Sequence, residues 1–274
     1  MPLAGVLGWP VSHSRSPAMH EAAYAEAGLA GWRYQRLPVP PELFAETVAA
    51  LEGAGFAGAN VTIPHKEAAL AAATDASAAA QAIGAANTLT FADGRIAAEN
   101  TDAPGLLDAL PVPPAGRTAL VLGAGGSARA AVWALASAGA RDVAVWNRTP
   151  ERAARLCADL GGRPVAVPEP ADILVNCTAA GLGAGEDPFA SLPLASQGLG
   201  AYAVVADLVY GDRPSALLAA ARAAGAATVD GLEILVRQGA RSFEIWTGRP
   251  APLEAMRAAC AAPLGGADPS LPSG

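Results

Sequence analysis

The segment TALVLGAGGSARA, residues 118–130, constrains the fold most, because closely spaced glycines join a buried strand pattern to a helix pattern. In a turn that holds a dinucleotide, Gly123 would form the tight bend, Gly125 would let the backbone approach a diphosphate, and Ala128 would allow close helix packing. The helix N-terminus offers free N–H groups to such an anion. An ordinary strand–helix turn shares part of this pattern, so the neighbouring segments must decide between the two.

Short β-branched runs alternate with longer alanine-rich stretches along the chain, which is typical of βαβ units around a parallel sheet. Strands are expected near residues 4–8, 34–39, 58–62, 118–123, 142–147, 172–177, 201–210 and 227–230, and a hairpin at 87–98. Helices are expected at residues 16–27, 41–51, from about 65, 127–138 and 232–246. Ser16 is expected to be the N-cap of the first helix, and Pro17 its first helical residue.

The fold is therefore predicted to be α/β, with a boundary near Asn100 and another near Gly231. Residues 1–101 form an α/β domain with a mainly parallel sheet, and residues 102–231 form a doubly wound, Rossmann-like dinucleotide-binding domain. Residues 232–262 are expected to be helices that return to the first domain. Residues 263–274, rich in Gly, Pro and Ser, predict a disordered tail.

The end of the strand at residues 142–147 favours NADP over NAD. An NAD site usually carries an acidic residue there for the ribose hydroxyls. Here the strand ends in Asn147, Arg148 and Thr149, with Arg152 one helical turn beyond. Two guanidinium groups without a carboxylate suit a 2′-phosphate, although solvated surface arginines would give the same sequence.

Composition excludes several classes of protein. The net charge of -7, without basic runs, argues against nucleic-acid and anionic-membrane partners. Three widely spaced cysteines predict reduced thiols, and three histidines without ligand spacing predict no metal site. With neither a signal peptide nor a transmembrane stretch, the chain is expected to be cytoplasmic.

Polar residues follow the expected strands of the first domain, at the sheet edge where ligands of open α/β sheets bind. Ser14 and Ser16 lie near a helix N-terminus and could bind a carboxylate or merely cap the helix. Lys66 falls in the first turn of a helix, where the helix dipole disfavours a cation, so it is either a functional group or a solvated lysine.

Taken together, these segments make the chain resemble the shikimate dehydrogenases. The strings GWPVSHSRSP, GANVTIPHK, GAANTL, ENTD, GAGGSARA, WNRT and DGLEILVRQGA occur in the order found in that family, over roughly Leu3 to Trp246. The resemblance implies NADPH-dependent reduction of 3-dehydroshikimate to shikimate, a step of aromatic amino-acid and chorismate biosynthesis. It also implies a small-molecule substrate and a monomer or homodimer.

The resemblance further implies a role for each matching residue. Lys66 and Asp102 flank the reacting carbon, with Lys66 supplying a proton and positive charge. The other implied substrate-binding residues are Ser14, Ser16 and Tyr210 for the carboxylate and Thr62, Asn87 and Gln238 for the ring hydroxyls. The implied cofactor-binding residues are Gly123, Ala124, Gly125, Gly126, Ser127 and Ala128 for the diphosphate, Asn147, Arg148, Thr149 and Arg152 for the 2′-phosphate, and Thr178, Leu208 and Gly231 near the nicotinamide.

Four positions depart from the common family pattern: Arg15, Ala179, Ala180 and Glu233. Glu233 stands where many members have a second glycine, which could move the loop near the nicotinamide. The alternatives are a quinate/shikimate or aminoshikimate dehydrogenase and, from another class, a non-catalytic NADP-binding sensor. The Lys66–Asp102 pair argues against the sensor, because binding alone does not need it.

Overall fold

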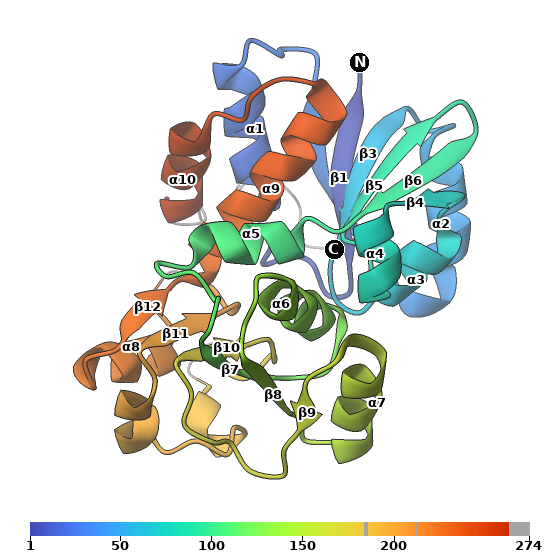
Figure 1. Ribbon diagram of the computed structural model, residues 1–274. Coiled ribbons are helices and arrows are strands. Elements are labelled where there is room, and N and C mark those ends of the chain that lie inside the picture. The colour runs from blue at the N-terminus through green and yellow to red at the C-terminus, as the bar shows by residue number, and fades with distance from the viewer. Residues whose placement is uncertain (184–185, 212, 263–274) are drawn as a thin grey trace.

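The computed structural model describes residues 1–183, 186–211 and 213–262, which form two lobes, each built on a six-stranded sheet (Figure 1). The expected disordered tail, residues 263–274, lies outside the described residues. In the described part of the chain, no helix is both long enough and apolar enough to cross a membrane.

The first sheet has the strand order β2-β1-β3-β5-β6-β4. Its strands are β1 (Leu3–Gly8), β2 (Arg33–Pro38), β3 (Phe56–Val61), β4 (Asp75–Ala76), β5 (Thr88–Ala92) and β6 (Arg95–Glu99). Strand β5 runs antiparallel to both β3 and β6, which confirms the hairpin. The pairings of β1 with β2, β1 with β3 and β4 with β6 are parallel.

Helices of the first lobe follow its strands: α1 (Ser16–Glu26), η1 (Pro41–Leu43), α2 (Phe44–Leu51), α3 (Lys66–Ala72) and α4 (Ala78–Ile83). The expected N-cap at Ser16 is wrong. Arg15 occupies that position, and Ser16 is the first helical residue. Because Arg15 already has helical dihedral angles, the helical turn starts one residue earlier than the proline pattern indicated.

The second sheet is entirely parallel, with the order β12-β11-β10-β7-β8-β9. Its strands are β7 (Thr118–Leu122), β8 (Asp142–Trp146), β9 (Arg163–Pro164), β10 (Ile173–Asn176), β11 (Val204–Asp207) and β12 (Ala227–Val229). The helices of this lobe are α6 (Gly126–Ser137), α7 (Pro150–Leu160), η2 (Pro188–Ala190), η3 (Ser196–Ala201) and α8 (Ala216–Ala223).

Alternate residues of β7 build two cores, because successive strand side chains point to opposite faces. Val121 packs with residues of α6 and α7, whereas Leu120 and Leu122 pack with η3 and α8. A sheet covered on both faces is the arrangement expected of a doubly wound fold.

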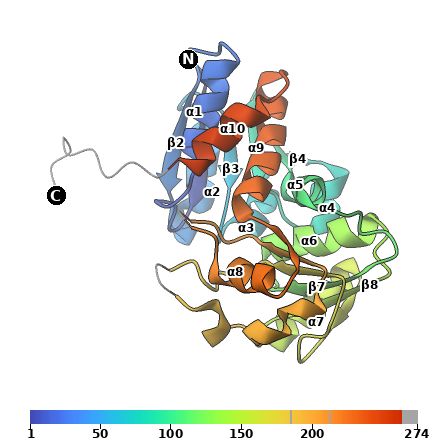
Figure 2. The ribbon, with the colours of Figure 1, turned by 90° about the vertical axis from the view of Figure 1, so that its left-hand side faces the viewer.

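Three further helices complete the described chain: α5 (Asp102–Ala109), α9 (Gly231–Thr247) and α10 (Leu253–Ala261). Helix α5 contacts both α9 and α6 at the junction of the lobes (Figure 1). Helices α9 and α10 lie beside α1 in the first lobe, as Figure 2 shows. Two glycines permit this packing, since a side chain at Gly58 would collide with Trp246 and one at Gly239 with Met19.

Candidate active site

A cleft between the lobes collects residues from both sheets. Among the residues implied by the sequence, the following line it: Ser14, Ser16, Thr62, Lys66, Asn87, Asp102, Ser127, Thr178, Leu208, Tyr210, Gly231 and Gln238. The cleft lies at the carboxyl ends of β1, β3, β10 and β11, the edge at which open α/β sheets bind ligands.

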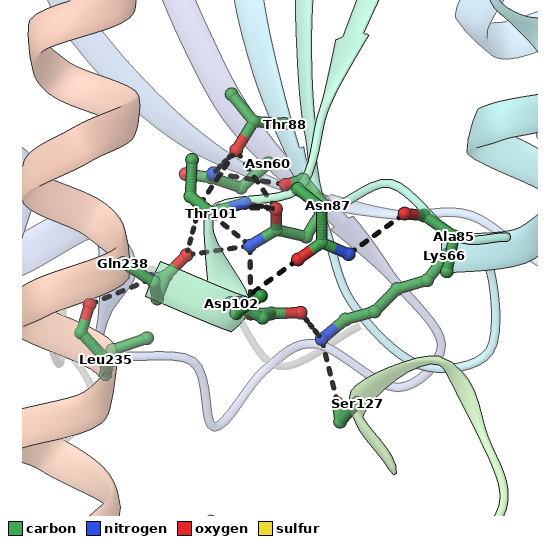
Figure 3. Close-up of polar contacts among 12 residues, drawn as sticks. Asn60, Lys66, Ala85, Asn87, Thr88, Thr101, Asp102, Ser127, Leu235 and Gln238 are labelled. Atoms are coloured by element: carbon green, nitrogen blue, oxygen red, sulfur yellow. Dashed lines mark hydrogen bonds and ion pairs between the residues drawn. The ribbon is translucent and has the colours of Figure 1, made fainter. Parts of the chain in front are cut away.

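Lys66 and Asp102 form an ion pair in this cleft (Figure 3). Each is the first residue of a helix, Lys66 of α3 and Asp102 of α5. The Nζ atom lies 2.5 Å from Asp102 Oδ2, and the side chains are only 11% and 16% exposed. An ammonium group held this way in a cleft can give a hydrogen bond or a proton to an oxygen atom of a bound molecule.

A buried hydrogen-bond network holds the carboxylate of the pair. Asn87 Nδ2 donates to Asp102 Oδ1 at 2.9 Å and to Gln238 Oε1 at 3.1 Å (Figure 3). Thr101 N donates to Asn87 Oδ1 at 2.7 Å, which fixes the orientation of that amide. Helix α9 contributes Gln238, so the return of this helix to the first lobe completes the network.

Sequence reasoning missed a second layer of this network. Asn60, Thr88 and Ser242 are buried next to Asn87, and Asn60 Nδ2 donates to both Thr88 Oγ1 at 3.2 Å and Ser242 Oγ at 2.9 Å. Asn60 lies in the motif GANVTIPHK and Thr88 in GAANTL, so these two motifs already contained both residues. Only the fold shows that these residues meet Ser242 of α9.

Two arginines outside the cleft lining hold the loop that carries Ser14. Arg36 donates from Nε and Nη2 to the carbonyl of Ser14, at 3.1 and 2.7 Å. The buried Arg15 donates to the carbonyls of Cys260, at 2.8 Å, and Ala262, at the end of α10. The departure at Arg15 therefore ties this loop to the last described helix.

Tyr210 meets the same loop from the second lobe. Burial raises the pKa of the Tyr210 phenol, and a hydrogen bond with Ser14 opposes this rise. The phenol thus stays protonated near neutral pH and remains a donor. Together, Ser14, Ser16 and Tyr210 supply three hydroxyl groups at one end of the cleft.

The glycine-rich turn has tight backbone geometry at one glycine and open space beside another. Gly123 has φ +112°, a backbone conformation that residues with a side chain rarely adopt. A side chain at Gly125 would meet open space, so a ligand can approach the backbone there. Ala128 is fully buried against the sheet, where a larger residue would push α6 away. Ala124 is also buried in this turn.

The residues implied for the 2′-phosphate lie at the end of β8 and the start of α7. Arg148, Thr149 and Arg152 are exposed, and Asn147 is partly exposed. Asn147 and Arg148 line a second hollow together with Thr178. Within the described ranges, no acidic group pairs with the guanidinium of Arg148 or Arg152. These cations are free to meet an anion from solvent.

The structure explains the residue types at positions 208 and 231. A side chain at Gly231 would lie 2.8 Å from the carbonyl oxygens of Leu208 and Val209, so the backbone itself requires glycine. Leu208 packs partly against the core of the second lobe. Both also line the cleft, together with Thr178, whose N and Oγ1 donate to Asn176 Oδ1.

Glu233 does not face the cleft. It accepts hydrogen bonds from Arg237 at 2.6 Å and from Arg257 at 2.7 Å, and so links α9 to α10. Ala179 lines the cleft, and Ala180 is buried beside it. The departures at these three positions leave the Lys66–Asp102 pair untouched.

Comparison with known proteins identifies the family. A model of the shikimate dehydrogenase substrate-binding domain matches residues 6–89. A model of shikimate/quinate 5-dehydrogenase matches residues 112–180, and one of the shikimate 5′-dehydrogenase C-terminal domain matches residues 231–260.

Individual proteins agree with these matches over nearly the whole chain. The NADP-dependent shikimate dehydrogenase of Methylobacterium radiotolerans is 46% identical, covering 97% of this chain and 98% of the relative. That of Methanothermobacter thermautotrophicus is 42% identical, covering 93% and 94%. The Thermus thermophilus shikimate 5-dehydrogenase, crystallised with NADP(H) and shikimate, has a TM-score of 0.85 at 40% identity, covering 95% and 98%. The chain therefore belongs to the shikimate dehydrogenase family.

Proposed function

We propose that this chain catalyses the reversible, NADPH-dependent reduction of 3-dehydroshikimate to shikimate, within the shikimate pathway. One observation carries this proposal: an ammonium–carboxylate pair lies in a cleft lined from one side by the Ser14 loop and from the other by Ser127 of the glycine-rich turn. A substrate and a dinucleotide could meet there, and relatives at 40–46% identity bear the same activity in their names.

In this proposal, the substrate carboxylate binds at Ser14 and Ser16, and Tyr210 donates a further hydrogen bond. Thr62, Asn87 and Gln238 bind the ring hydroxyls, and amide groups suit this task because they both donate and accept. Asn87 and Gln238 are already bonded to each other at 3.1 Å, so little side-chain freedom is lost when the substrate arrives.

When bound, NADPH supplies the hydride for the ketone carbon. The chain supplies the proton and stabilises the developing negative charge. Lys66 Nζ donates to the ketone oxygen, and transfers a proton to it as the alkoxide forms. Asp102 orients the ammonium through its 2.5 Å contact, and Asn87 holds Asp102 at 2.9 Å. In the reverse direction, the neutral amine accepts the proton of the shikimate hydroxyl.

The residues of the second lobe fit NADP. Gly123 to Ala128 would hold the diphosphate, since Gly125 faces open space at the N-terminus of the 12-residue helix α6. Asn147, Arg148, Thr149 and Arg152 would hold the 2′-phosphate with exposed donors. Thr178, Leu208 and Gly231 would lie near the nicotinamide. A cytoplasmic location and a monomeric or homodimeric state are further proposals.

The test is spectrophotometric. Purified protein is mixed with shikimate, quinate or aminoshikimate, each with NADP⁺ or NAD⁺, and the formation of reduced nicotinamide is followed. We expect the highest kcat/KM for shikimate with NADP⁺. Preference for quinate or aminoshikimate would replace the substrate assignment. Failure to reduce either cofactor with any of the three acids would instead support a non-catalytic sensor.

A further inference from the structure

Lys66 is hydrogen-bonded to both sides of the cleft at once. Besides Asp102, its Nζ atom donates to Ser127 Oγ at 2.9 Å (Figure 3). Asp102 belongs to the network of the first lobe, whereas Ser127 lies in the first turn of α6, directly after the glycines of the second lobe. The proposed proton donor therefore touches the proposed diphosphate site through one side chain.

The backbone of the turn also packs on the lysine. A Cβ atom added at Gly126 would lie 2.7 Å from Lys66 Cβ, so no side chain fits between them. Its neighbour Gly125 instead faces open space. Gly126 therefore packs against Lys66, whereas Gly125 faces open space that a ligand could occupy. Ser127 is the next residue in the chain. A ligand bound at Gly125 would act on the same short, ordered segment that holds Lys66.

The Ser127 hydroxyl can hydrogen-bond to Lys66 and to a bound phosphate at the same time. A hydroxyl group has one hydrogen to donate and two lone pairs to accept. Because it accepts from the Lys66 ammonium, its own hydrogen remains for another acceptor. The N-cap residue of α6 is Gly125, which has no side chain that could cap the helix. The N–H groups at this end of α6 therefore also remain for an anion.

We propose that Ser127 is a positioning residue that couples occupancy of the diphosphate site to Lys66. With a diphosphate at the turn, the hydroxyl donates to a phosphate oxygen and still accepts from Nζ. This makes a chain of hydrogen bonds in which each bond strengthens the next. The cofactor thereby fixes the ammonium before the ketone is reduced. The inference rests on the proposed cofactor site, and goes beyond it by linking that site to the proton donor.

The sequence offers a direct probe, because Lys66 is its only lysine. Protein labelled with ¹³C at the lysine ε-carbon gives one side-chain NMR signal, and its position is recorded while NADP⁺ is added to saturation. We expect NADP⁺ to move this signal in the parent, to move it much less in Ser127→Ala, and to move it again in Ser127→Thr, which restores the hydroxyl. Ser137→Ala, at the exposed far end of α6, is the matched control and should follow the parent.

Binding of NADP⁺ is measured on the same samples by calorimetry, so that a failed coupling and a failed cofactor site are told apart. If NADP⁺ binds and moves the signal equally in the parent and in Ser127→Ala, the coupling is wrong while the proposed function stands. If NADP⁺ binds without moving the signal in the parent, the coupling is again wrong. If NADP⁺ does not bind the parent at all, both proposals fail.

Discussion

The two sides of the cleft differ in how far their polar groups are already paired. On the first lobe, Asp102 bonds to Lys66 at 2.5 Å and to Asn87 at 2.9 Å, and all three side chains are largely buried. On the second lobe, Gly125 faces open space and Arg148 is exposed to solvent. The polar groups of the first-lobe site are thus paired before any ligand binds, whereas those of the second lobe remain for a ligand to pair with.

This difference follows from the size and charge of what each side would bind. A small cyclic acid presents few groups, so catalysis gains most when the residues around it are held in place beforehand. A dinucleotide presents phosphates that bind backbone N–H groups and exposed cations directly. Substitutions should therefore act on turnover in the first lobe and on cofactor affinity in the second.

The largest effect is expected for Lys66→Met, which removes the ammonium but keeps an unbranched side chain. Loss of the proton donor should lower kcat by about 10²- to 10⁴-fold. Shikimate binding, measured by calorimetry, should change far less, because Ser14 and Ser16 remain. Turnover within about threefold of the parent, with the fold intact by circular dichroism, would show that Lys66 is not the proton donor.

The next effect is expected on the second lobe, for Arg148→Ala. Removing one charge-assisted contact to the 2′-phosphate should lower kcat/KM for NADP by about 10- to 100-fold. The value for NAD, which lacks this phosphate, should hardly change. Arg155→Ala is the matched control, because Arg155 is likewise exposed but lies further along the chain, on α7. Equal losses for the two cofactors would refute the role of Arg148.

How far the sequence alone predicts the molecule also differs between the two sides. The glycine-rich turn is local, so residues 118–130 predicted β7, the bend at Gly123 and α6 directly. The network of the first lobe joins Asn60, Thr88 and Ser242, from three separate segments. No spacing in the sequence encodes such a meeting, because it arises only when α9 packs on the first sheet.

Element ends were the least predictable feature of the fold. The expected strand at 201–210 is β11, only Val204–Asp207, and the expected helix at 41–51 begins as the 3-10 turn η1. The two-residue strands β4 and β9 were not predicted at all. Such short elements carry too little hydrophobic periodicity to stand out, and neighbouring strands decide where they pair.

A smaller effect, on stability, is expected from the layer beneath the first-lobe site. His20 is fully buried, stacked on Tyr34 and close to Trp246, and burial lowers its pKa to about 3. Unfolding returns this pKa to about 6.5, so below pH 6.5 the unfolded chain binds the extra proton and stability falls as pH falls.

When the pH falls from 7 to 5, protonation of His20 in the unfolded chain should by itself lower the parent's free energy of unfolding by about 2 kcal/mol. His20→Phe keeps a ring in the stack but cannot take up a proton, so its free energy of unfolding should fall less over the same range. Urea titrations of both proteins at the two pH values measure this. If the two proteins lose equal stability on acidification, His20 does not titrate as its burial implies.

The smallest effect is expected for Glu233→Gln, away from the cleft. Its carboxylate pairs with Arg257 and Arg237, and the hydrogen bond from Arg257 lowers the pKa of Glu233. This partly exposed pair should contribute at most about 1 kcal/mol, a contribution lost as pH falls through that lowered pKa. Thermal unfolding with steady-state kinetics would check this, and a large fall in kcat would place Glu233 in the active site after all.

The central claim is that Lys66 and Asp102 meet the reacting hydroxyl opposite the cofactor. A crystal structure of the dead-end complex with shikimate and NADPH tests it most directly. We expect the hydroxyl that is oxidised to lie about 2.6–3.2 Å from Lys66 Nζ, with its carbon about 3.5 Å from the nicotinamide. A complex in which Lys66 and Asp102 bond only to each other, while that hydroxyl points elsewhere, would contradict the account.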